Sequence, residues 1–272
     1  PPPPPPPPPP FFFHPHPAIP DCLLSRGLGD VYKRQLNVII DTDSANEIDD
    51  LFAITRAIQE PNFRLLGITA AQFHTSPYAS NNTALESHEI NKEFIGLIPN
   101  FKVPLIVGSS LPLKNAKTPR ISDASQFIID QARILPKEKK LYLIILGSCT
   151  NVASALLEAP EIKSKLVVLY VGFWHDTKKN TYDKKEFNTN NDITATNFLL
   201  DSKGLDFRIM SATTSQYLVF KKSIASLFNS KNPKSAVGIL YFSQSFFVNI
   251  FEPSSCDEIL LGPKTLILNF SK

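Results

Sequence analysis

The residues with the clearest capacity for chemistry are five carboxylates within the ten-residue segment DTDSANEIDD. They are Asp41, Asp43, Glu47, Asp49 and Asp50, and no lysine or arginine lies among them to offset their repulsion. The charge of a helix N-terminus would favour Asp49 and Asp50 alone. A hard divalent cation accounts for the whole cluster, and Ca²⁺ accepts the irregular coordination of a loop more readily than Mg²⁺ does. The segment therefore predicts a metal site.

The rest of the chain must supply elements that position this cluster. From Leu36 onward, apolar runs alternate with segments of helical period, a pattern typical of strands and helices around a parallel sheet. We expect an α/β fold: a single doubly wound, mostly parallel sheet flanked by helices, with its ligand outside the carboxyl ends of the strands. The expected strands are 36–40, 63–70, 103–108, 140–147, 165–172 and 205–212, and the expected helices are 49–59, 80–97, 122–132, 151–159 and 192–200.

The N-terminal segment differs in composition from the remainder. It holds 13 of the 24 prolines in its first 20 residues, a density that forms polyproline II or no fixed structure. The stretch from Cys22 to Gln35 resembles translated sequencing-adapter read-through. We expect residues 1–35 to be a disordered or artefactual proline-rich leader and residues 36–272 to form the folded domain.

Composition narrows the class of protein. A hydrophobic share of 43% suits a globular core, and a net charge of +3 argues neither for nor against nucleic acid. The 3 cysteines have neither metal-ligand nor redox spacing, which favours a reducing compartment. No apolar run is long enough for a membrane span. We expect a cytoplasmic protein that binds neither nucleic acid nor membrane.

Two further segments accompany the acidic one: LGSCTNVASAL (residues 146–156) and EFNTNNDITA (residues 186–195). Together the three resemble the motifs of one known family, the inosine-uridine preferring nucleoside hydrolases. The acidic segment resembles the family's DTDxANExDD branch, and the other two resemble its LGxxTNxAxAL turn and its EFNxxxD segment. Because the three motifs occur in the family's order, together they are far more specific than any one alone.

The resemblance implies roles for individual residues. It implies that Asp43 is the general base and a calcium ligand, that Asp50 is a second ligand, and that Thr150 offers its backbone carbonyl to the metal. Asp257 stands at roughly the distance of the family's late aspartate ligand. The remaining residues would contact the sugar or the base, or support the site: Asp49, Glu186, Asn188 and Gln72 toward the ribose, His74, Trp174 and His175 toward the leaving base, and Asp41 and Asn151 as support.

Simpler explanations stay open for several of these residues. Thr150 and Asn151 would also serve to cap the helix that follows them, and Asn188 would serve to close a turn. His74 and His175 would be equally ordinary in surface loops. The residues around Asp257 match the family poorly and lack its Trp-Asp pair, so we expect a truncated or aberrant C-terminus.

The implied activity is calcium-dependent hydrolysis of the N-glycosidic bond of a ribonucleoside, which releases free base and ribose. A small-molecule nucleoside is then the substrate, and a homodimer or homotetramer is the expected assembly. One alternative is a catalytically defective member of the same fold that binds ribosides or calcium. Another is a haloacid dehalogenase-like phosphotransferase, which also places a DxD sequence after its first strand.

Overall fold

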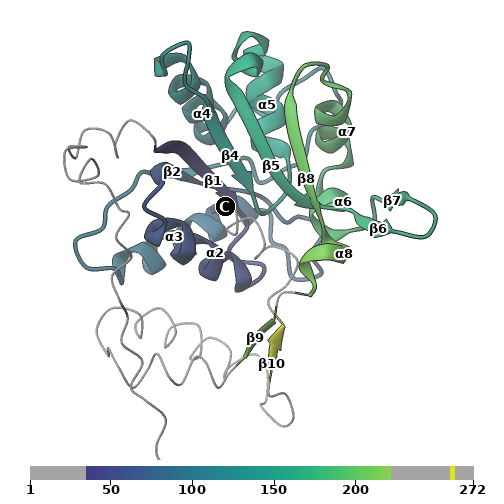
Figure 1. Ribbon diagram of the computed structural model, residues 1–272, viewed down its shortest axis with the longest axis horizontal. Coiled ribbons are helices and arrows are strands. Elements are labelled where there is room, and N and C mark those ends of the chain that lie inside the picture. The colour runs from purple at the N-terminus through teal and green to yellow at the C-terminus, as the bar shows by residue number, and fades with distance from the viewer. Residues whose placement is uncertain (1–34, 218, 222–257, 261–272) are drawn as a thin grey trace, which may run out of the picture. The chain divides into compact units, whose positions relative to one another are not determined.

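The computed structural model describes residues 35–217, 219–221 and 258–260. A six-stranded sheet has the strand order β3-β2-β1-β4-β5-β8, and each neighbouring pair of its strands is parallel (Figure 1). This confirms the expected doubly wound α/β fold. The strands are β1 (Leu36–Thr42), β2 (Phe63–Ala70), β3 (Leu105–Val107), β4 (Leu141–Ile145), β5 (Leu166–Gly172) and β8 (Asp206–Ser211).

Helices cover the two faces of this sheet (Figure 1). Side chains alternate between the faces of a strand, and in β1 this separates two apolar clusters. Val38 and Ile40 pack with residues of α2 (Asp49–Gln59) and α3 (Thr83–Gly96). Ile39 packs in the other cluster, to which three further helices contribute: α4 (Asp123–Ile134), α5 (Thr150–Glu158) and α7 (Ile193–Asp201). The strands are therefore buried on both sides, as their apolar runs predict.

Several short elements connect this framework. After β5 the chain forms an antiparallel hairpin that the sequence analysis did not anticipate. The short elements are η2 (Pro160–Lys165), the hairpin strands β6 (Trp174–Asp176) and β7 (Thr181–Asp183), α6 (Phe187–Asn191), α8 (Ala212–Ser215), and the antiparallel pair β9 (Val219–Lys221) and β10 (Glu258–Leu260).

Some predictions fall on other parts of the chain. The leader up to residue 34 and the predicted ligand Asp257 lie outside the described residues. Cys149 is buried and carries a free thiol.

In the described part of the chain, no helix is both long and apolar enough to cross a bilayer.

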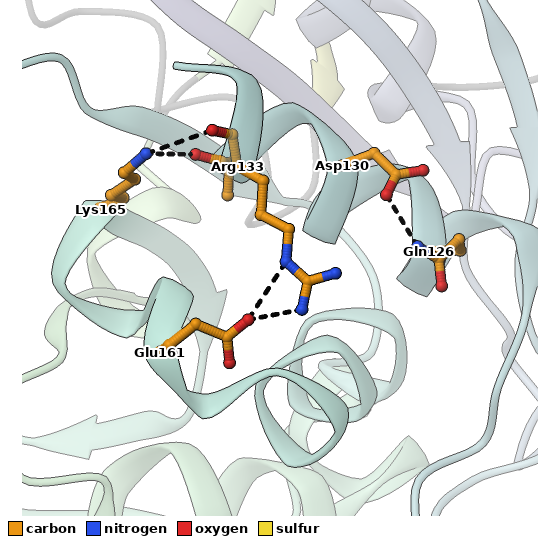
Figure 2. A network of polar contacts seen from close by, with 6 residues as sticks. Gln126, Asp130, Arg133, Glu161 and Lys165 are labelled. Carbon is orange, nitrogen blue, oxygen red and sulfur yellow. Dashed lines mark hydrogen bonds and ion pairs between the residues drawn. The ribbon is translucent and has the colours of Figure 1, made fainter. Parts of the chain in front are cut away.

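Helix α4 has defined contacts at both ends. At its start, Ser122 and Ser125 form a reciprocal capping box. At its end, the Lys165 ammonium donates to the carbonyl oxygens of Ala132 at 3.0 Å and Leu135 at 2.7 Å. Figure 2 shows this lysine beside the ion pair of Arg133 and Glu161. A cation at a helix C-terminus complements the exposed carbonyl groups there, so Lys165 ties the end of η2, just before β5, to the end of α4.

The order of the strands locates the expected ligand site. The chain builds β2 and β3 on one side of β1, and β4, β5 and β8 on the other. The direction of winding therefore reverses between β1 and β4, and ligands in open α/β sheets bind at the carboxyl edge beside such a reversal. The acidic segment begins at this edge, at the end of β1.

Candidate functional site

Four of the five carboxylates at the end of β1 are buried. Asp41, Asp43, Asp49 and Asp50 are at most 2% exposed, whereas Glu47 is exposed. A solvated acidic turn therefore does not describe this segment. Burial strengthens repulsion between like charges, so four buried carboxylates need cations, donors or protons around them.

Asp41 continues the Ile39 face of β1 toward the start of α5. Its Oδ1 accepts hydrogen bonds from Thr69 Oγ1 at 2.6 Å and from Asn151 Nδ2 at 2.9 Å. Its Oδ2 is buried without a hydrogen-bond partner. Burial raises the pKa of Asp41 to about 7, and the charge of Asp43 adds to the rise, while the two donors oppose it. Asn151 thus bonds directly to the acidic segment and is not the N-cap of α5.

Local bonds hold the remainder of the acidic segment. The backbone N–H of Asn46 donates to the Asp43 carbonyl at 2.8 Å and closes a turn. The Ser44 hydroxyl bonds to Asn91 Oδ1 on α3 at 2.8 Å, which ties this turn to the helix. The chain then enters α2, where the Thr42 hydroxyl donates to Asp50 Oδ2. Asp43 and Asp50 are therefore held by β1, α2 and α3 together.

The main chain after β4 lies against Asp43. The Leu146 N–H donates to the Asp41 carbonyl at 2.7 Å, which carries the sheet bonding to the end of β1. A Cβ atom at Gly147 would lie 2.8 Å from Asp43 Oδ1, a separation too short for any side chain. Glycine is therefore required here by the close approach of the carboxylate, rather than by its own backbone angles.

The segment from Glu186 to Asn191 joins the same edge of the sheet. The side-chain amide of Asn188 donates to the carbonyl oxygens of Leu146 at 2.9 Å and Val171 at 3.0 Å. Leu146 directly follows β4, and Val171 lies near the end of β5. Asn188 therefore bridges these two strands and does more than close a turn. Its Oδ1 is buried without a hydrogen-bond partner, which leaves an acceptor for a ligand donor or a cation.

Glu186 is the N-cap of α6. Its carboxylate accepts from the backbone N–H groups of Asn188 and Thr189 at 3.1 and 2.9 Å. It also accepts from the N–H of Phe173 at 3.2 Å. Phe173 has a left-handed backbone with φ of 62°, a conformation that a bulky residue rarely adopts. Glu186 thus stabilises the strained joint between β5 and the hairpin, in addition to any contact with a sugar.

Thr150 presents its hydroxyl to the edge of the sheet. Its carbonyl oxygen accepts from the Ser154 hydroxyl at 2.7 Å, a bond within α5. Its hydroxyl donates to Asp192 Oδ2 at 2.7 Å and accepts from Gln72 Nε2 at 3.2 Å. The N-cap of α5 is Cys149, which makes no side-chain cap bond, so capping does not explain Thr150. The Thr150 hydroxyl is thus engaged in two hydrogen bonds, and the implied role of its carbonyl as a metal ligand stays a prediction.

The hairpin holds the other predicted base contacts. The ring of His175 stacks on Tyr182 with 4.3 Å between centroids, and its Nε2 lies 3.1 Å from Asn180 Oδ1. Its backbone N–H donates to Thr213 Oγ1 at 2.7 Å. Trp174 is 40% exposed on the same hairpin. Thus His175 is engaged with the hairpin and α8, whereas His74, four residues after the end of β2, contacts Gln72.

The oxygen atoms at the acidic cluster are of the type that binds a hard cation, but the described side chains supply too few of them for a complete site. Carboxylate and amide oxygens suit Ca²⁺, and buried Oδ atoms of Asp41 and Asn188 have no hydrogen-bond partner. Among residues 35–217, 219–221 and 258–260, however, no three histidine, cysteine or acidic side chains are arranged to hold a metal ion together. Calcium takes 6–8 oxygen ligands, including carbonyl groups and water, so carboxylates need supply only some of them.

Fold and site together define the class of protein: a doubly wound α/β protein with a buried acidic ligand site at the point where the winding reverses. The model of the inosine-uridine preferring nucleoside hydrolase family matches residues 38–260. The chain belongs to this family, whose named members are hydrolases of N-glycosyl bonds. The match rules out the haloacid dehalogenase-like alternative.

Individual relatives agree with this assignment. The chain is 27% identical over 224 residues to a probable uridine nucleosidase 2 of Oryza sativa subsp. japonica, which covers 71% of this chain and 62% of the relative. It is 30% identical over 162 residues to uridine nucleosidase 1 of Arabidopsis thaliana, covering 51% of this chain and 45% of the relative. The chain therefore spans less than two thirds of either relative.

A solved structure agrees on the fold. An inosine-guanosine nucleoside hydrolase superposes with a TM-score of 0.65 at 18% identity, covering 86% of this chain and 77% of that chain. At this identity the likeness establishes the fold alone.

Three contributors to the site were missed by sequence reasoning. The Leu146–Gly147 main chain borders Asp43, and Asp192 accepts from Thr150. Asn191 Oδ1 accepts from the N–H of Thr75 at 2.9 Å and so ties the loop after β2 to α6. Asp192 and Asn191 both lie within the EFNTNND segment, so that motif was the available signal. Nothing in the pattern of residues shows that the Leu146–Gly147 backbone would face a carboxylate.

Proposed function

We propose that this protein hydrolyses the N-glycosidic bond of ribonucleosides with the help of calcium, releasing free base and ribose. The observation that carries the proposal is the buried acidic cluster of Asp41, Asp43, Asp49 and Asp50 at the carboxyl edge between β1 and β4. Family membership supports the reaction type. The chemistry of the donor atoms supports a hard cation.

The reaction divides among the residues of the site. A water oxygen bonds to the anomeric carbon of the ribose, the bond from that carbon to the base breaks, and the base leaves with the electron pair. Asp43 accepts the proton of the attacking water, and Asp49 and Asn188 bind ribose hydroxyls so that the ring is held for attack. Asp43, Asp50 and Asp257 would hold the calcium ion. When bound, the ion would act as a Lewis acid that activates the water.

The identity of the base that leaves is the part of the reaction for which the structure gives the least information. Both plant relatives are named uridine nucleosidases, and we propose uridine as the first substrate. His74 and Trp174 are the proposed contacts on the side of the base. The first lies just after β2 and the second on the hairpin after β5.

The direct test is hydrolysis by the full chain of a panel of nucleosides that includes uridine, inosine, guanosine and deoxyuridine. Free base is separated by chromatography and reducing sugar is measured, once with added Ca²⁺ and once with chelator. The expected result is base and ribose in equal amounts, with release abolished by the chelator and restored by Ca²⁺. Release that is unaffected by the chelator would contradict the calcium part of the proposal alone.

Substitution at Asp43 separates catalysis from binding. Asp43→Asn removes the proton acceptor, and loss of one general base typically costs about 10²- to 10⁴-fold in rate. The matched control is Asp130→Asn, which changes an exposed carboxylate on α4 (Figure 2). Binding of ribosides without turnover is the second candidate, since no three acidic, histidine or cysteine side chains among the described residues are arranged to hold the metal that turnover would need. Binding of uridine by a folded protein that releases no base from any nucleoside would favour that second candidate.

Assembly and location complete the proposal. We propose a homodimer or homotetramer in the cytoplasm, on the resemblance and on the cysteine pattern respectively. Light scattering coupled to gel filtration measures the first, and imaging of a tagged full chain measures the second.

A further inference from the structure

A chain of hydrogen bonds connects the exposed His74 to the buried Asp192. The His74 ring nitrogen Nδ1 lies 3.2 Å from Gln72 Oε1, which also accepts the His74 backbone N–H at 2.7 Å. At the other end of the same side chain, Gln72 Nε2 donates to Thr150 Oγ1 at 3.2 Å and to the Asn191 carbonyl at 3.0 Å. Thr150 Oγ1 then donates to Asp192 Oδ2.

The orientation of the Gln72 amide is fixed from both ends. A backbone carbonyl can only accept, so the atom facing Asn191 must be the nitrogen Nε2. A backbone N–H can only donate, so the atom facing the His74 backbone must be the oxygen Oε1. Gln72 is fully buried, and reversing its amide would break both bonds. The Gln72 oxygen that meets the imidazole ring is therefore an acceptor.

Asp192 anchors the far end of the chain. Its Oδ1 accepts the Ala195 N–H at 2.8 Å and caps α7, and its Oδ2 accepts the Leu113 N–H at 2.8 Å. These bonds hold the carboxylate in place beside Thr150. Oε1 can only accept, so an Nδ1 without a hydrogen would place two lone pairs 3.2 Å apart; neutral His74 therefore carries its hydrogen on Nδ1.

We propose that Gln72, Thr150 and Asp192 are positioning residues that hold neutral His74 as the Nδ1–H tautomer, so that Nε2 presents its lone pair at the carboxyl edge of the sheet. His74 is exposed, and it lies four residues beyond the end of β2. Its Nε2 then accepts a hydrogen bond from a hydroxyl or N–H group of the substrate. This last step rests on the proposed function, whereas the tautomer does not.

The tautomer is measured directly by long-range ¹H–¹⁵N correlation on the full chain labelled with ¹⁵N-histidine, at a pH where the ring is neutral. The His74 signals are assigned by their loss in His74→Asn. We expect the pattern of an Nδ1–H ring, although isolated histidine in water favours Nε2–H. An Nε2–H ring in the unsubstituted protein would overturn the proposal, and this measurement needs no activity.

Substitutions then test the chain of hydrogen bonds from His74 to Asp192. Gln72→Met keeps the length of the side chain and removes the acceptor, so the His74 ring should move toward Nε2–H. Asn180→Ala is the matched control, since it removes the partner of His175 Nε2 and should leave His74 unchanged. If Gln72→Met does not fold, the tautomer of the unsubstituted chain still decides the question.

Thr150 offers a readout in kinetics. Thr150→Val removes the hydroxyl and keeps the carbonyl, whereas Thr150→Ser keeps both. If the hydroxyl acts through His74 on substrate binding, Thr150→Val should raise KM several-fold with a smaller effect on kcat, and Thr150→Ser should restore KM. Equal KM values for the two variants would contradict an effect of the Thr150 hydroxyl through His74. Absence of any hydrolysis with an Nδ1–H ring present would instead contradict the proposed function alone.

Discussion

Asp41 provides the sharpest test of the electrostatics of the site, in the metal-free protein. Its pKa is raised from 3.8 to about 7, chiefly by burial. Between these values the folded state holds a proton that the unfolded state releases, so the contribution of Asp41 to stability is fully present below pH 4 and is lost as pH rises through 7. Each full pH unit inside this window is worth about 1.4 kcal/mol, and because the folded-state group is half deprotonated at pH 7, the loss between pH 5 and pH 7 is about 2 kcal/mol.

Asp41→Asn removes the titration. The amide oxygen of asparagine can still accept from Thr69 and Asn151, so the variant should fold. Urea unfolding of the full chain in chelator, from pH 5 to pH 8, measures the free energy of unfolding. Relative to the unsubstituted protein, the variant should gain about 3 kcal/mol over this range.

The matched control is Asp201→Asn, which replaces an exposed carboxylate at the end of α7. It should follow the pH profile of the unsubstituted protein. Parallel profiles for all three proteins would refute the argument, because they would show that Asp41 does not bind an extra proton in the folded state.

Further predictions concern the geometry around this residue. Gly147→Ala should lower the rate of nucleoside hydrolysis about 100-fold, because its Cβ displaces Asp43, and unchanged kcat would contradict the close approach. Asn151→Ala should destabilise the protein by about 2 kcal/mol in chemical denaturation, since it removes the amide donor to Asp41 Oδ1 and to the Ala70 carbonyl. Lys165→Met should cost about 1 kcal/mol by removing the cation at the end of α4, whereas the exposed Lys137→Met should cost little; equal losses would argue against that contact.

The framework of the fold was accessible from sequence because its elements have uninterrupted patterns. The run FRLLGITA gives β2 with the expected bounds, and the helical period after Asp49 gives α2. The hairpin of β6 and β7 was missed because its strands have three residues each and its turn, with Asn180 at φ of 47°, lacks glycine. Elements this short depend on contacts from elsewhere, such as the bond of His175 to Thr213.

Contributions to the site from side chains could be predicted from the motifs, whereas contributions from main-chain atoms could be predicted less well. Asp41 and Asn151, 110 positions apart in sequence, were placed in one site by the motifs and lie 2.9 Å apart in the structure. The roles implied for Asp43, Asp50, Asp49 and Glu186 stay predictions. Thr150 shows the limit, because the motif identifies the residue while only the geometry shows that its hydroxyl is the group engaged with Gln72 and Asp192.

The burial of four carboxylates beside one another has a consequence for the life of the protein in a cell. A newly made chain must bring these groups together, and their mutual repulsion costs free energy that protonation, hydrogen bonds or a bound cation offsets. The proposed calcium, at 100 times its dissociation constant, would add about 2.7 kcal/mol to the folded state. Differences of this size alter how much of a protein escapes degradation, so the amount of this protein would rise and fall with the supply of the ion.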